Sequence, residues 1–169
     1  ITPWQIRQAT AGEELSDALM VRVEDGSGVP VVGAPVTFTV SKGAGSLLDD
    51  AVEPILLTRS LTVTSGYDGI ARARFVPGES VYNNPIVVTR PDDEQANIVG
   101  ENLIAAQLVT GSLATLDDPI IVLGFAGQPD LQMIQVIGEG KIGDVLSYAG
   151  DAGIILMDHF GNPVANHPI

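Results

Sequence analysis

The residues of this chain with the clearest capacity for chemistry are carboxylates that gather in short runs. The runs are Glu13-Glu14, Asp49-Asp50, Asp92-Asp93-Glu94 and Asp117-Asp118. Calcium binds about six to eight oxygen ligands, often carboxylates, so two acidic loops that meet at a domain junction would suit it. None of the runs matches an EF-hand loop or a glycine-rich calcium-binding repeat. We therefore expect most of these acids to be solvated loop residues and predict no cofactor other than calcium. The calcium candidates are Asp92, Asp93, Glu94, Asp117 and Asp118.

The other reactive side chains form no catalytic motif. His159 and His167 fall in expected turns, and no Glu stands at a metalloprotease spacing from either. No serine lies in a Gly-x-Ser-x-Gly elbow, and the bend at 41–46 has its lysine before its glycines, unlike a phosphate-binding loop. A glycosidase carboxylate pair is defined by its separation in space, which the sequence leaves open. We predict that the chain is not an enzyme, and that Trp4 packs at a junction rather than against sugar.

Composition excludes several classes of partner. The 169 residues carry 21 Asp and Glu against 8 Lys and Arg, a formal net charge of −13. Nucleic acids and anionic membranes attract positive surfaces, so we expect neither as a partner. The chain has no cysteine, no signal peptide and no apolar run of about 18 residues, so we predict no disulfide and no membrane insertion in this segment. It begins with Ile1 and ends inside an expected strand, as a piece of a longer polypeptide would.

Short strands are the elements expected to position these residues. Between Leu19 and Val40, two alternating apolar runs flank a turn rich in Asp, Gly and Pro. This pattern is typical of two half-buried strands and their connection. Strands are predicted at 4–9, 18–23, 36–40, 57–63, 70–76, 85–89 and 103–109. Short strands at this spacing favour an all-β fold, a sandwich of two sheets.

An internal repeat suggests more than one module. The stretch 158–169 matches 25–36 without a gap, at a constant offset of 133 positions. The shared residues include Asp25 with Asp158, Gly28 with Gly161 and Pro30 with Pro163. His159 and His167 align with Gly26 and Ala34, so the first copy does without histidine and we expect both to be surface turn residues. The repeat predicts that a second module begins near residue 131.

The first copy carries three further motifs. They are Val-x-Asp-x-x-Gly-x-Pro-Val-x-Gly-x-Pro-Val-Thr-Phe-x-Val at 23–40, Gly-x-Gly-Ser-Leu at 43–47 and Thr-Val-Thr-x-x-x-Asp-Gly-Ile-Ala at 62–71. Together these motifs resemble the bacterial immunoglobulin-like domains of the invasin and intimin type. The resemblance implies tandem immunoglobulin-like β-sandwiches. We expect a complete sandwich at 1–112, a linker or bridging strand at 113–130 and the N-terminal part of a second sandwich at 131–169.

The resemblance implies a structural role. The first hypothesis is a module of a repetitive bacterial cell-surface or secreted protein, such as an adhesin stalk or fibre, whose partners are neighbouring modules of the same protein and whose location is extracellular. A second is a filament subunit that forms a homopolymer by strand exchange, because an incomplete module leaves strand edges unpaired. A third is an accessory polysaccharide-binding module of a secreted enzyme, although eight aromatic residues form no cluster in the sequence.

Overall fold

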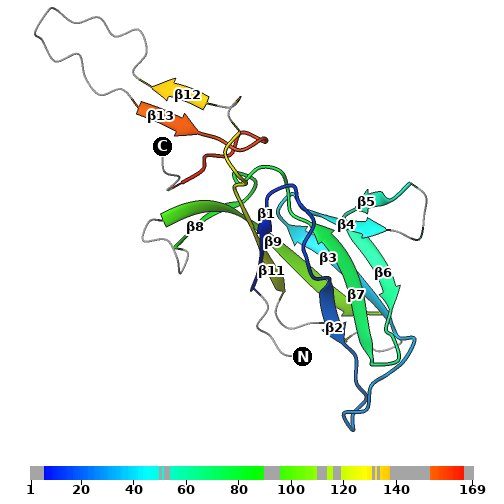
Figure 1. The fold of residues 1–169 in the computed structure, drawn as a ribbon. Coiled ribbons are helices and arrows are strands. Elements are labelled where there is room, and N and C mark those ends of the chain that lie inside the picture. Colours follow the sequence, from blue (N-terminus) through cyan, green and yellow to red (C-terminus); the bar gives the residue numbers. More distant parts are fainter. Residues whose placement is uncertain are drawn as a thin grey trace, which may run out of the picture.

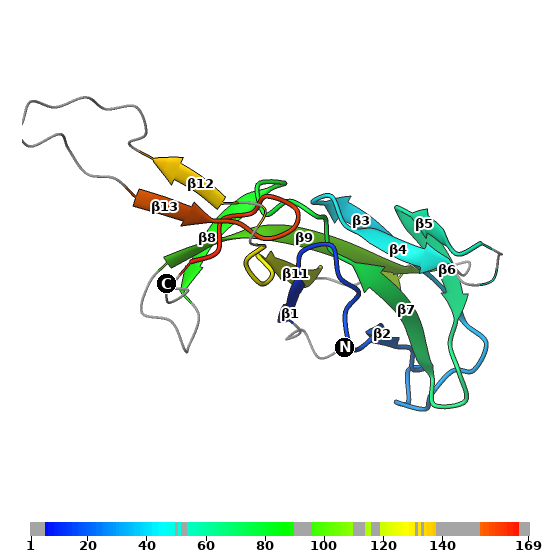
Figure 2. The ribbon, with the colours of Figure 1, turned by 45° about the horizontal axis from the view of Figure 1, so that its top comes forward.

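The computed structural model describes residues 6–49, 51, 54–89, 96–109, 114–115, 119–130, 132, 134–137 and 153–165. Over these residues every regular element is a β-strand (Figure 1). Two sheets pack face to face, and a separate pair of strands projects from one end (Figure 2). The predicted all-β class and the two-sheet sandwich are therefore confirmed.

The first sheet contains seven strands. Its main order is β1 (Ile6–Thr10), β11 (Ile120–Phe125), β9 (Ala96–Leu108), β3 (Pro35–Lys42) and β6 (Ser60–Thr64). The strands β8 (Pro85–Thr89) and β10 (Ala114–Thr115) also pair with β9. Neighbours run antiparallel, except that β1 is parallel to β11.

The second sheet has the order β2 (Leu19–Arg22), β7 (Ile70–Val76), β4 (Ser46–Asp49) and β5 (Leu56–Thr58), all antiparallel. The remaining strands are β12 (Ile134–Ile137) and β13 (Gly153–Leu156), which pair with each other and with no other described strand.

Alternation along the strands supplies the core between the two sheets. In β3 the side chains of Val36, Phe38 and Val40 are buried, while those between them are partly exposed. In β7 the side chains of Ala71, Ala73 and Phe75, which share one face of the strand, are buried as well. Phe38 and Phe75 are fully buried, and each such side chain stabilises the fold by roughly 1.5–3 kcal/mol relative to an exposed one.

The predicted strand at 57–63 changes sheets at Arg59. Its first part forms β5 beside β4, and its second part forms β6 beside β3. The Arg59 guanidinium donates to the carbonyl oxygens of Val40, Gly43 and Gly45 at 2.6–3.2 Å, so the switch is tied to the glycine-rich bend between β3 and β4. The register of the pairing between β3 and β9 shifts between Val40 and Lys42, next to this bend.

Residues 120–125 lie in the stretch 113–130 that was predicted to be a linker or bridging strand. They form β11 inside the first sheet, between β1 and β9. Ile120 and Val122 belong to the main core, and Leu123 and Phe125 form a smaller cluster with Val99. The sandwich therefore includes a strand beyond residue 112.

Candidate functional site

The calcium candidates from the sequence are not among the residues that the structure describes. Asp92, Asp93, Glu94, Asp117 and Asp118 all lie outside those ranges. In the described part of the chain, no group of three or more His, Asp or Glu side chains lies close enough together to hold a metal ion. Calcium binding at the five candidates stays a prediction.

The described acids of the other runs have ordinary roles. Glu14 accepts hydrogen bonds from Nε and Nη2 of Arg74 at 2.6 and 2.7 Å, and these bonds lower the pKa of the Glu14 carboxyl. Asp49 accepts a hydrogen bond from the backbone N–H of Ala51 at 3.1 Å. Glu13 lines a groove of about 500 Å³ beside β1 and β11. Among the described residues that line this groove, Glu13 is the only one with a charged side chain.

The site with the most elaborate geometry is a turn in the second copy of the repeat. Its counterpart in the first copy is the turn at 25–29. There the Asp25 Oδ1 atom accepts from the backbone N–H groups of Ser27 and Val29 at 2.8 and 3.0 Å. These bonds lower the pKa of Asp25. The backbone of Asp25 also bonds to Gly28 and Val29, and Gly28 has a φ of 81°.

The second copy repeats this turn bond for bond at the offset of 133. The Asp158 Oδ1 atom accepts from the N–H groups of Phe160 and Asn162 at 3.0 and 2.9 Å. The backbone of Asp158 bonds to Gly161 and Asn162 in the same way, and Gly161 has a φ of 79°. A left-handed glycine is favoured at that position because a Cβ atom would strain it. The likeness that the sequence predicted is therefore present in the local backbone.

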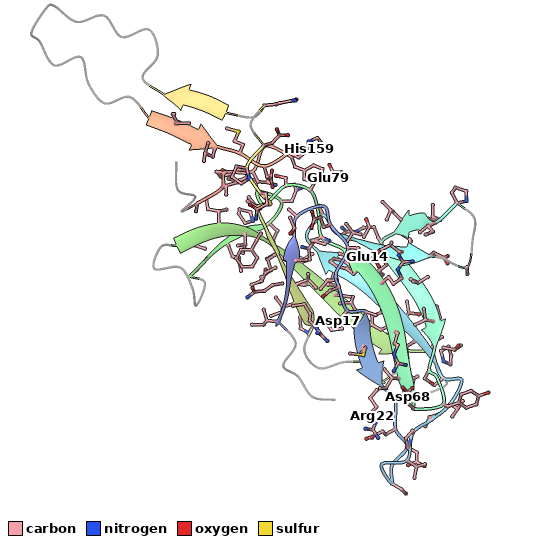
Figure 3. The ribbon with its side chains drawn as sticks, in the orientation of Figure 1. Glu14, Asp17, Arg22, Asp68, Glu79 and His159 are labelled. Atoms are coloured by element: carbon pink, nitrogen blue, oxygen red, sulfur yellow. The ribbon has the colours of Figure 1, made fainter. Side chains whose placement is uncertain are left out.

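The two turns differ in their surroundings. The Asp25 turn is exposed at one end of the sandwich, whereas the side chains of Asp158 and Asn162 are only 2% and 1% exposed. Figure 3 shows His159, next to Asp158, beside Glu79 at the end opposite Asp68 and Arg22. We call the contact between residues 158–162 and the sandwich the junction turn contact.

Three side-chain hydrogen bonds cross this contact to backbone groups of the sandwich and the segment after β11. Asn162 accepts from the N–H of Val81 at 2.9 Å and donates to the carbonyl oxygen of Glu79 at 2.7 Å. The Asp158 Oδ2 atom accepts from the N–H of Gly127 at 2.8 Å. Asn162 Nδ2 also donates to Asp158 Oδ2 at 2.9 Å, so the two buried side chains support each other. Buried polar groups that are satisfied in this way hold one geometry, because any shift would leave them unpaired.

Apolar contact and a peripheral polar pair complete the junction turn contact. A Cβ atom placed on Gly12 would lie 2.5 Å from a ring atom of Phe160, so this aromatic ring sits directly against the backbone of the sandwich. Asp130 bonds to Met157 through the backbone, and its carboxylate lies 3.3 Å from Nδ1 of His159. A hydrogen bond from the N–H of Gln132 and the contact with His159 lower the pKa of Asp130.

Sequence reasoning placed His159 on a surface turn, and the structure agrees, since its side chain is exposed. His167 and Trp4 lie outside the described residues. Reasoning from the sequence missed Asp158 and Asn162 as contact residues. The available signal was the repeat itself, in which Asn162 and Phe160 stand where the first copy has Val29 and Ser27.

The chain matches no protein-family model, and comparison with curated proteins and with solved structures finds no similar protein. Among the described residues, no helix has the length and apolar character needed to cross a bilayer.

Proposed function

We propose that this chain is a structural module of a repetitive bacterial cell-surface or secreted protein, in which it holds consecutive immunoglobulin-like sandwiches at a set orientation within a stalk or fibre. The observation that supports this role is the junction turn contact. The turn that precedes β3 in the first copy is, in the second copy, buried against the end of the sandwich before it. A chain organised in this way transmits direction from one module to the next and needs no catalytic group.

The chemistry of the contact suits this role. A mainly apolar contact between modules could slide, because the hydrophobic effect is not directional. Asn162 and Asp158 instead bond to backbone groups of Glu79, Val81 and Gly127. The loss of one such buried partner costs about 1–3 kcal/mol, so the orientation is specified by several bonds at once. The resemblance to invasin-type domains supports the immunoglobulin-like type, the tandem arrangement and the extracellular location.

The test is whether the bonds hold the second segment in place. NMR on the whole chain measures both the hydrogen exchange of the bonded amides and, through relaxation, the motion of the second segment. We expect slow exchange of the Val81 and Gly127 amides, and relaxation rates in 134–137 and 153–165 that match those of the sandwich. In Asp158→Ala both amides exchange faster and the segment tumbles more freely. The matched control is Asp25→Ala, which alters the equivalent turn at the other end and leaves these amides unchanged. Independent tumbling in the unaltered chain would contradict the proposal.

A second candidate function, assembly by strand exchange, has one observation in its favour. In the first copy β1 pairs with β11 and β2 pairs with β7, so the two strands belong to different sheets. Near the corresponding places in the second copy, β12 and β13 pair with each other, and each has one partner in the described part of the chain. Unpaired strand edges are templates for another chain. Light scattering on the whole chain decides this: oligomers or fibres favour exchange, and a monomer at all concentrations rejects it.

A further inference from the structure

The exposed turn of the first copy has the internal bonds of the junction turn but lacks its external bond. In the second copy, Asp158 Oδ1 holds the turn and Oδ2 reaches across to the N–H of Gly127. In the first copy, Asp25 Oδ1 holds the turn in the same way, and Oδ2 has no partner in the described part of the chain. Asp25 therefore presents an ionised acceptor atom, held by a turn already in the conformation that binds in the second copy.

Large apolar side chains are exposed on this turn and on the loops that follow β2 and β6. Val29 is 56% exposed, Val32 is 54% exposed and Tyr67 is 96% exposed. Hydrogen bonds from Gly33 to Ser65 and from Ser65 to Val31 hold the two loops that carry these side chains together. We call the surface of Asp25, Val29, Val32 and Tyr67 the turn end. Exposed large apolar side chains on bonded loops, together with one oriented acceptor, have the composition of a protein contact, in which a polar group sets the direction.

The substitutions between the two turns indicate the chemistry of the partner. Where the Asn162 side chain bonds to the backbone of residues 79 and 81, the first copy has Val29, whose side chain offers no polar atom. The contact of the turn end therefore lacks these two bonds. Its partner should still present a backbone N–H at the position of Gly127, because Asp25 is retained.

From these contacts we propose that the turn end docks onto the end of another sandwich of this type, where Asp25 Oδ2 accepts a hydrogen bond from a backbone N–H and Val29, Val32 and Tyr67 pack against apolar side chains. The inference rests on the proposed function, because it takes the junction turn contact as its template. It adds a second docking surface at the opposite end of the sandwich and names the atom that orients it.

The test adds a copy of residues 1–133 ahead of the whole chain, which keeps the spacing of 133 residues between successive turns. The chain has no cysteine, so Leu57→Cys in each sandwich gives one pair of spin labels on the exposed strand β5. We expect pulsed electron resonance to give one narrow distance distribution. Asp25→Asn in the trailing copy keeps an oxygen for the turn and replaces the outer acceptor with an N–H₂ group, so the distribution broadens. The same change in the leading copy, whose turn end faces solvent, is the control and leaves it narrow.

Three results would overturn the proposal. One is a broad distribution in the unaltered double chain, and another is a distribution that Asp25→Asn in the trailing copy leaves narrow. The third is dimerisation of the original chain that Val29→Ser abolishes, which would assign the turn end to self-association. A second label pair, on Leu57→Cys and Ile154→Cys of the original chain, reports the junction turn contact separately. If that pair is rigid and the double chain is not, the further inference fails while the proposed function stands.

Discussion

At the scale of single residues, the equivalent aspartates of the two copies have different roles. The Oδ1 atoms of Asp25 and Asp158 both close a turn, and among the described residues only the Oδ2 atom of Asp158 bonds to another part of the molecule. Sequence alone shows that both positions carry Asp, but it does not show which one is buried. Burial follows from what lies opposite the turn, and this contact links residues far apart in the chain.

The pairing of Glu14 with Arg74 predicts a pH dependence of stability. The bonds from Arg74 lower the pKa of Glu14 below its ordinary value of 4.5, so the ionised carboxylate is favoured in the folded state. Its contribution is present above pH 4.5 and is lost as the pH falls through the lowered pKa. We expect Glu14→Gln to reduce the free energy of unfolding by less than about 1 kcal/mol at pH 7, because the pair is half exposed.

Urea unfolding at pH 7 and at pH 2 measures the difference in unfolding free energy between the parent chain and Glu14→Gln. It should shrink toward zero at the lower pH, where the carboxylate of the parent chain becomes protonated. The control is Glu13→Gln, which removes a neighbouring charge that forms no ion pair among the described residues. An equal loss of stability at both pH values would show that Glu14 acts through packing rather than through its charge.

At the scale of elements, the bend between β3 and β4 depends on a glycine with no room for a side chain. Gly43 has a φ of 87°, and a Cβ atom there would lie 2.5 Å from the carbonyl oxygen of Glu101. Gly28 has a similar φ of 81° but open space around it. We expect Gly28→Ala to cost about 1–2 kcal/mol of unfolding free energy, the strain of a left-handed residue. Gly43→Ala should cost clearly more, because β9 must also move.

Thermal and urea unfolding of the two variants side by side give the comparison. Both substitutions make the same chemical change at nearly the same backbone angle, so the difference between them isolates the close approach of β3 and its bend to β9. Equal losses would mean that the Glu101 backbone shifts at little cost.

The elements that could be predicted are those with a local signal. Alternation in 36–40 and 70–76 predicted the buried faces of β3 and β7, and the Asp25–Pro30 turn was predicted from its residue types. The run 119–124 was not assigned to the sandwich, because a continuous apolar run lacks the alternation that marks a half-buried strand. In the structure β11 lies between β1 and β9, with Ile120, Val122 and Leu123 all buried, which explains its composition.

The change of sheet at Arg59 could not be predicted from the sequence, for a related reason. Alternation shows which side chains share a face of a strand. It does not show which neighbouring strand pairs with that strand, because this depends on residues far away in the sequence. Leu57 and Leu61 have the same parity, yet one lies on β5 in the second sheet and the other on β6 in the first. The contact residues Asp158 and Asn162 were missed likewise, since their partners are backbone groups that no side-chain pattern reveals.

At the scale of the whole molecule, the position of β11 predicts where the first sandwich can be cut. A chain of residues 1–112 lacks β11, which leaves β1 without the one strand partner it has in the described part of the chain and opens the side of β9 that β11 covers. It also removes Ile120 and Val122 from the core. Each buried aliphatic side chain contributes roughly 1.5–3 kcal/mol, and the whole stability of a domain is only about 5–15 kcal/mol.

We therefore expect residues 1–112 to show no cooperative thermal transition, and residues 1–130, which retain β11, to unfold cooperatively. Circular dichroism with calorimetry distinguishes the two. A full chain with Val122→Asp serves as the matched control, because it keeps β11 but places a charge in the same core position. If the shorter chain unfolds as cooperatively as the longer one, then β11 is an addition to a sandwich that is complete without it. In that case residues 113–130 act as the bridging strand between modules that their sequence suggested.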